Sequence, residues 1–173
     1  RTAMDNERFE QELLAYLEEK REAMTRRFHR VLPTGELLFN RYDKAAYLGA
    51  GEGTSVYDTS VIMGDVRLGK KVWVGPYTLI EGIHAPVTVG DFVSINTGVQ
   101  VYSHDSTKHY VSGGKVPFKT GPVTIGDCTV IGSMSMIACG VTIGSHCVVG
   151  AGSMVTQDIP DGHIAAGTAA RLI

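Results

Sequence analysis

The sequence predicts a mainly β protein: a parallel β-helix of six-residue repeats, preceded by an N-terminal α-helix and interrupted by one extruded loop. Three observations support this fold class. Aliphatic residues recur at every sixth position over much of the chain, residues 3–31 carry an apolar stripe with helical spacing, and a stretch at about 102–122 has no periodicity. We therefore expect an N-terminal helix with a connecting segment over residues 1–53 and the β-helix over residues 54–173.

The N-terminal helix is expected over residues 3–31, because the apolar residues there recur in steps of three, four and seven. Pro33 and Gly35 end it. An apolar stripe on a helix must be covered, and we expect the repeat domain or a second subunit to cover it, with a coiled coil as the alternative. The stripe consists of Phe9, Leu13, Leu17, Met24, Phe28 and Val31.

The six-residue repeat is clearest in VIGSMSMIACGVTIGSHCVVGAGSMV, residues 130–155. An α-helix has a period of 3.6 and a flat strand a period of 2, so neither explains this spacing. A small or β-branched residue follows most of these aliphatic residues after four positions, for example Val72 after Leu68 and Thr129 after Ile125. The aliphatic series are Val56, Ile62, Leu68, Val74 and Ile80; then Val89, Ile95 and Val101; and finally Ile125, Ile131, Ile137, Ile143, Val149 and Val155.

A six-residue unit is too short to bury its own aliphatic side chain, so stability must come from stacking on neighbouring turns. Glycine often directly follows the aliphatic residue, as in Gly69, Gly75 and Gly126. Glycine at one fixed phase indicates a tight corner, which either needs positive φ or leaves no room for a Cβ atom. Short strands alternating with such corners describe a parallel β-helix.

Composition excludes several classes of function. The net charge of −2 gives no reason to expect nucleic-acid binding. No apolar run approaches the roughly 18 residues of a membrane-spanning helix, so we expect no membrane insertion. The three cysteines, Cys128, Cys139 and Cys147, have no CxxC spacing and fit free thiols in a reducing compartment. We therefore expect a cytoplasmic protein.

The segment VTIGDCTVIGSMSMIACGVTIGSHCVVGAGSMVTQDIPDGHIAAGTAARLI resembles the hexapeptide-repeat acyltransferases, the family of the maltose, galactoside and xenobiotic acetyltransferases. The resemblance covers about residues 54–173. It implies a left-handed β-helix and a homotrimer with active sites at the subunit interfaces. The sequence independently supports association, because the outward-facing positions Val130, Met136, Val148 and Met154 are apolar.

The extruded loop, YSHDSTKHYVSGGKVPFKTGP, carries the expected general base. Long loops without periodicity are usually functional. In the family that this chain resembles, such a loop carries a catalytic histidine, and VQVYSHDSTKHY matches it at His104 rather than His109. An imidazole titrates near neutral pH and suits the removal of a proton from an attacking hydroxyl or amine.

The group that orients His104 is left open between Glu81 and Asp105. Neighbouring side chains in an extended segment point apart, which argues against Asp105. Glu81 lies where the repeat slips by three residues, and can reach the site from another turn. The maltose and galactoside enzymes carry an asparagine about thirty residues before the histidine, and this chain has no match. Tyr77, His84 and Asn96 are therefore the candidate contacts to the acceptor.

The C-terminal repeats resemble the family's coenzyme A groove. The resemblance implies that acetyl-CoA is the acyl donor, that no metal is required, and that small residues leave room for the pantetheine arm. Arg171 would approach the nucleotide phosphates. The matched positions are Ser133, Gly150, Ala151, Thr156 and Arg171.

The resemblance implies acetyl-CoA-dependent O-acetylation of a sugar or polysaccharide-precursor hydroxyl, with His104 as general base and a small-molecule or glycan acceptor. The alternative within the class is N-acetylation of a nucleotide-linked amino sugar. His104 and His109 also have the HxxxxH spacing of the γ-class carbonic anhydrases, whose metal is held by three histidines. A non-catalytic scaffold is the third class.

Overall fold

The computed structural model describes residues 3–173, and the chain divides into two compact units with the boundary between Asn40 and Arg41. The first unit contains α1 (Ala3–Phe28) and α2 (Thr34–Leu38). Helix α1 ends at Phe28, three residues earlier than predicted. The next residue, His29, has a left-handed conformation with φ of 53°. The predicted apolar stripe stays exposed, as at Phe9 and Phe28, so what covers it remains a prediction.

The second unit begins earlier than the expected boundary at residue 54, because α3 (Arg41–Tyr47) packs on the first coil of the β-helix. Ala45 is buried in the core of that coil. The Lys44 ammonium donates hydrogen bonds to the carbonyl oxygens of Tyr57, Asp58 and Ser60, at 3.0, 2.9 and 2.7 Å. The helix therefore caps the open end of the coil.

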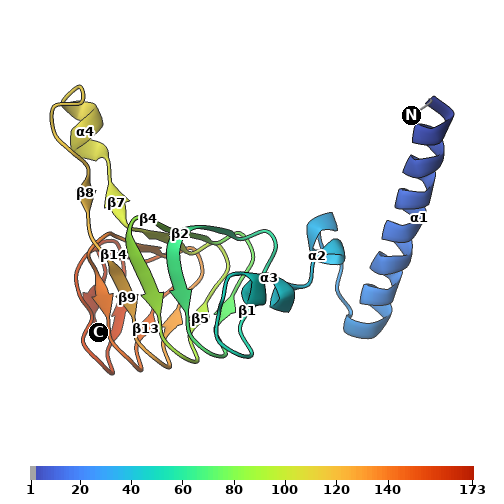
Figure 1. Ribbon diagram of the computed structural model, residues 1–173. Coiled ribbons are helices and arrows are strands. Elements are labelled where there is room, and N and C mark those ends of the chain that lie inside the picture. The colour runs from blue at the N-terminus through green and yellow to red at the C-terminus, as the bar shows by residue number, and fades with distance from the viewer. Residues whose placement is uncertain (1–2) are drawn as a thin grey trace. The chain divides into compact units, whose positions relative to one another are not determined.

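Six parallel strands stack along the first face of the β-helix (Figure 1). A seventh strand, β16 (Arg171–Leu172), pairs with the last of them in the antiparallel sense. The parallel strands are β1 (Ser55–Val56), β3 (Trp73–Val74), β5 (Ser94–Ile95), β10 (Val130–Ile131), β13 (Val148–Val149) and β15 (Ile164–Ala166).

The second sheet bends round a corner and supplies the other two faces. The beginning of β4 (Leu79–Val89) pairs with β6, and its end pairs with β9. The result is the predicted left-handed β-helix with three faces (Figure 1). The second face contains β6 (Gln100–Tyr102), β11 (Met136–Ile137) and β14 (Met154–Val155), the third contains β9 (Val123–Ile125) and β12 (Thr142–Ile143), and β2 (Val61–Leu68) runs across both beside β4.

The aliphatic positions of the repeat form the core. Parallel pairing aligns Val74 with Ile95, and Ile95 with Ile131, so like side chains stack along each face. These three residues are fully buried. Burying each such side chain contributes roughly 1.5–3 kcal/mol, and stacking is what removes it from water.

The glycines that follow the aliphatic residues are required because there is no room for a side chain. A Cβ atom on Gly126 would lie 2.5 Å from the backbone nitrogen of Ser145 in the next coil. The positive φ occurs two residues later in the repeat, at Cys128 and Met134 and, in a later coil, at Gly152. The sequence allowed two reasons for glycine at this position of the repeat, positive φ or a lack of room for a Cβ atom. The structure supports the second, because the backbone of the next coil lies too close.

Two insertions leave the β-helix at the same corner, between its second and third faces. Ile80 and Val89 are nine positions apart instead of six, and one coil later Val101 and Ile125 are twenty-four apart. The longer insertion is the predicted loop, and it is a projecting hairpin (Figure 1). It consists of β7 (His104–Asp105), α4 (Thr107–Val111) and β8 (Lys119–Thr120), with β7 and β8 antiparallel.

No helix within residues 3–173 is long and apolar enough to span a membrane.

Replacing Ile125 by alanine should lower the free energy of unfolding by about 2–5 kcal/mol, because the cavity lies inside the stacked core. Thr124→Ala is the matched control, since Thr124 precedes Ile125 in β9 but faces solvent, and should cost at most about 1 kcal/mol. Urea denaturation at one protein concentration measures both. Equal losses would contradict the core position of Ile125.

Candidate active site

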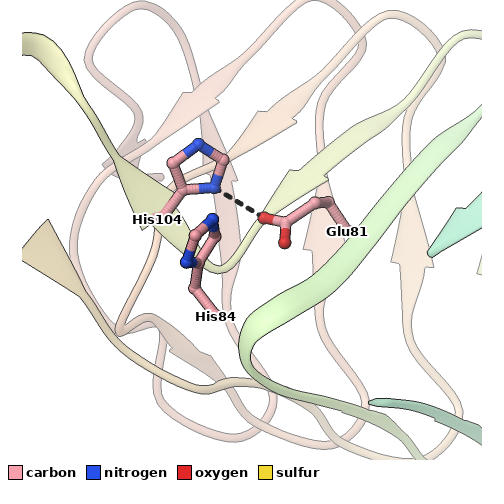
Figure 2. Close-up of side chains that lie close together, drawn as sticks. All are labelled: Glu81, His84 and His104. Carbon is pink, nitrogen blue, oxygen red and sulfur yellow. Dashed lines mark hydrogen bonds and ion pairs between the residues drawn. The ribbon is translucent and has the colours of Figure 1, made fainter. Parts of the chain in front are cut away.

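The shared corner brings three titratable side chains together. Glu81 lies in β4 where the first insertion begins, and His84 lies within that insertion. His104 begins the hairpin of the next coil. Parallel pairing places Glu81 beside Tyr102, two residues before His104. Figure 2 shows the two imidazole rings close to the Glu81 carboxylate.

Glu81 is a buried carboxylate whose oxygens are fully occupied by donors. Its Oε2 atom lies 2.8 Å from Nδ1 of His104. The backbone N–H of Ser103 donates to the same oxygen at 3.1 Å, and the Ser103 hydroxyl lies 2.9 and 3.0 Å from the two oxygens. The backbone N–H of Ile83 donates to Oε1 at 2.6 Å. The carboxylate is therefore held in one orientation.

These donors keep Glu81 ionised. Burial raises the pKa of Glu81, but the hydrogen bonds from His104, Ser103 and Ile83 together outweigh burial and lower it to about 2. A carboxylate can only accept hydrogen bonds, so Nδ1 of His104 must carry the proton. In the neutral imidazole Nε2 then has a free lone pair, and this nitrogen points away from Glu81 (Figure 2).

Aromatic contacts fix the plane of the His104 ring. Phe118, on the returning arm of the hairpin, stacks on it with ring centroids 5.5 Å apart and an interplanar angle of 18°. The same phenyl ring contacts His84 at 5.4 Å and His109 at 4.8 Å. Phe118 cannot be identified from the sequence, because nothing in the loop's composition shows which of its residues returns to the coil.

Only one of the two carboxylates considered for orienting His104 is hydrogen-bonded to its imidazole. Asp105 lies on the opposite side of β7, and its carboxylate accepts the backbone N–H of Thr107 at 2.8 Å, at the start of α4. Hydrogen bonds from the side chain and the backbone of Thr107, with the neighbouring charge of Lys119, lower the pKa of Asp105. Glu81 contacts the imidazole and Asp105 does not, as expected from the alternation of side chains along a strand.

The acceptor candidates are divided between two corners. His84 joins the cluster, with its ring centroid 4.4 Å from that of His104. Tyr77 and Asn96 instead lie at the corner between the first and second faces. Tyr77 occupies a positive-φ turn position, and the Asn96 side chain accepts a hydrogen bond from Ser94 at 2.8 Å. The structure does not bring these two residues to His104.

The residues matched to the coenzyme A groove also occupy more than one place. Ser133 and Ala151 follow strands of the first face and lie at the same corner one coil apart, joined by a hydrogen bond between Gly152 and Ser133. Thr156 lies at the corner of His104, two coils further along. Arg171 is exposed in β16. A Cβ atom on Gly150 would approach that of Ala166 to 2.9 Å, so packing alone explains this glycine.

Within residues 3–173, one group of side chains has the composition and spacing to hold a metal ion, and it consists of Glu81, His84 and His104. His109 is not part of it. Its Nδ1 atom lies 2.8 Å from the carbonyl oxygen of Val116, within the hairpin. The HxxxxH pair considered from the sequence is therefore not a metal site.

Exchanging Glu81 for glutamine should change how stability depends on pH. Because the pKa of Glu81 falls from its ordinary 4.5 to about 2 on folding, ionisation contributes about 3 kcal/mol above pH 4.5. This contribution is lost as pH falls toward 2. We expect urea denaturation to show wild type losing its advantage over Glu81→Gln across that range. Glu52→Gln, at an exposed position, should not reproduce the effect, and a constant difference would contradict the buried charge.

The comparisons with known proteins agree with this fold. Residues 122–157 match the family model described as bacterial transferase hexapeptide (six repeats). The galactoside O-acetyltransferase of Escherichia coli is 41% identical over 87 residues, which are 50% of this chain and 43% of that protein. The bifunctional protein GlmU of Streptococcus suis is 38% identical over 115 residues, which are 62% of this chain and 23% of that protein.

The chain thus spans less than half the length of these two relatives. A crystal structure of AntD, an N-acyltransferase from Bacillus cereus in complex with dTDP and 3-hydroxybutyryl-CoA, has a TM-score of 0.65 and 29% identity. The match covers 72% of this chain and 70% of that one. Residues 122–157 therefore match the hexapeptide repeat of bacterial transferases, and the chain resembles acyltransferases that contain this repeat.

Proposed function

We propose that this chain is a coenzyme A-dependent acyltransferase that acetylates a hydroxyl group of a sugar or polysaccharide precursor, with His104 as general base. The observation that carries the proposal is the contact between the buried Glu81 carboxylate and Nδ1 of His104. It leaves Nε2 as a proton acceptor on a side chain that is partly exposed at the base of the hairpin. The O-acetyltransferase relative supports the same chemistry.

In the proposed reaction, Nε2 of His104 takes the proton of the acceptor hydroxyl as its oxygen attacks the thioester carbonyl carbon. The C–O bond forms, the tetrahedral intermediate collapses, and the C–S bond breaks. The leaving thiolate receives the proton back from Nε2. Glu81 stabilises the imidazolium in between and keeps the proton of Nδ1 in place, a division of roles like that of the aspartate in a serine–histidine–aspartate triad.

The presence of an oriented general base favours a hydroxyl acceptor. A hydroxyl is a weak nucleophile until its proton is removed during attack, whereas a neutral amine attacks first and loses its proton afterwards. A carboxylate-oriented imidazole contributes more to the first case. The second candidate is nonetheless N-acylation of a nucleotide-linked amino sugar, because the structure of AntD, an N-acyltransferase, contains dTDP and an acyl-CoA.

For the acyl donor, we propose acetyl-CoA bound along the second face of the β-helix. The edges of this face carry Ser133 and Ala151 at one corner and Thr156 at the other. Small side chains at the corners leave space for an extended pantetheine arm. Arg171 is exposed at the C-terminal end, where a guanidinium can contact phosphate oxygens. The acyl-CoA in the AntD structure supports a thioester donor.

We further propose a homotrimer whose interfaces use the first and second faces. In the C-terminal coils these faces carry exposed apolar residues at outward positions, with Val130 at 38%, Val148 at 41% and Met154 at 37%. The outward residues of the third face are polar, for example Thr88, Thr124 and Thr142. The hairpin leaves the edge of the second face, so it would reach a neighbouring subunit in such an assembly.

Replacing His104 by alanine should lower kcat by about 10²–10⁴-fold and leave the KM for acyl-CoA nearly unchanged, because only the base is lost. Steady-state thiol release with a panel of sugars and amino sugars measures this. His109→Ala is the matched control, since it removes another imidazole that contacts Phe118, and its loss should be far smaller. Equal kcat values for wild type and His104→Ala would contradict the base assignment.

Arg171→Ala should weaken acetyl-CoA binding by roughly tenfold, the loss expected for one charge-assisted phosphate contact. Calorimetric titration measures it without any acceptor. Arg67→Ala is the control, because Arg67 is a surface arginine paired with Asp65. Failure of the folded wild-type chain to bind acetyl-CoA would overturn the donor assignment.

Light scattering on the purified chain should give the mass of three subunits. Val148→Glu should shift it toward the monomer, because it places a charge in the proposed interface. Thr124→Glu puts the same charge on the third face and should leave the trimer intact. A monomeric wild type, or dissociation caused equally by both variants, would contradict the proposed interfaces.

A further inference from the structure

We propose that Glu81, His84 and His104 form a binding site for a divalent transition-metal ion of the zinc type, and that the bound ion switches off the base. The inhibitory part rests on the proposed function, whereas the binding part does not. The group offers two imidazole nitrogens and one carboxylate oxygen, all within 4.8 Å of one another. Zinc accepts this donor set and leaves a fourth position for water or another ligand.

The ligand atoms are already held in place by their surroundings. Ser103 donates to the Glu81 carboxylate through both its backbone and its hydroxyl, and its hydroxyl oxygen accepts the backbone N–H of His84 at 3.2 Å. Phe118 contacts both imidazole rings. Such outer contacts orient metal ligands and raise affinity. Ser103 is fully buried, so the group that links all three ligands cannot move away freely.

Binding at this site is incompatible with catalysis by His104. The nitrogen of His104 that faces Glu81 is Nδ1, at 2.8 Å from Oε2. A metal ion bound between these atoms takes the place of the Nδ1 proton. The single proton of the neutral imidazole then resides on Nε2, so Nε2 becomes a donor and cannot accept a proton from the acceptor hydroxyl. The ion therefore holds the histidine in the wrong tautomer.

Because two of the three ligands are accessible to solvent, metal binding at this site is expected to be reversible. Glu81 is buried, but His84 is exposed and His104 is partly exposed, so an ion can enter from solvent without unfolding the coil. Imidazole ligands favour zinc, cobalt, nickel and copper over magnesium and calcium, which prefer oxygen ligands. Magnesium is thus the natural negative control.

Direct binding is tested with Co²⁺ as a spectroscopic probe on the metal-free 173-residue chain, followed by competition with Zn²⁺. Wild type should bind one Co²⁺ per chain with visible absorption bands, and Zn²⁺ should displace it. His84→Ala should weaken affinity roughly tenfold or more. His109→Ala, which alters an imidazole outside the group, should leave it unchanged. Matching melting temperatures for the variants exclude misfolding as the cause.

Lack of saturable binding, or equal affinity in wild type and His84→Ala, would overturn the site. In a second measurement, Zn²⁺ should inhibit acyl transfer, and a chelator should reverse the inhibition. The His84→Ala variant should require roughly tenfold more Zn²⁺ for half inhibition, whatever the turnover of the uninhibited variant is. Binding without inhibition would overturn the switch and keep the site. If no acceptor is turned over, the proposed function fails, and the Co²⁺ titration still decides the site.

Discussion

The structure depends on the register in which successive coils of the β-helix stack. Each coil buries its aliphatic residues only because the coil beside it presents the same residue type at the same place, as at Ile95 and Ile131. Close stacking leaves no space for a side chain on Gly126. Because the register is fixed on all three faces, an insertion can leave the coil only at a corner. Two insertions in neighbouring coils therefore emerge side by side, and this adjacency creates the site.

The site combines a rigid wall with a projecting hairpin. Glu81 belongs to the wall, where burial makes an unpartnered charge costly and four hydrogen-bond donors compensate for it. His104 belongs to the first residue pair of the hairpin, and Phe118 returns to pack against it. The Glu81 carboxylate sets the tautomer of the His104 imidazole, and the Phe118 ring sets the plane of that imidazole. The same arrangement supports the proposed metal site, since an imidazole held beside a carboxylate is also a pair of preorganised ligands.

The repeat could be predicted from the sequence because its physical cause is local: an aliphatic residue at every sixth position has no other regular solution. Glu81 could be proposed as a partner of His104 because it sits at a break in that period. Phe118 could not be found, because its role depends on how the hairpin returns. Tyr77 and Asn96 are candidates only because the family's asparagine has no match in this chain, and the structure places them at another corner, after strands of the first face. The glycine phase was recognised, but sequence alone did not distinguish close approach from positive φ.

The most direct test of the central claim is the tautomer of His104, measured by nitrogen-15 NMR of the imidazole in the metal-free protein at neutral pH. His104→Ala provides the assignment of the signal. We expect the proton on Nδ1 and a free Nε2, with the preference lost in Glu81→Gln. A proton on Nε2 in the wild-type protein would contradict the role of Glu81 and, with it, the assignment of His104 as a base.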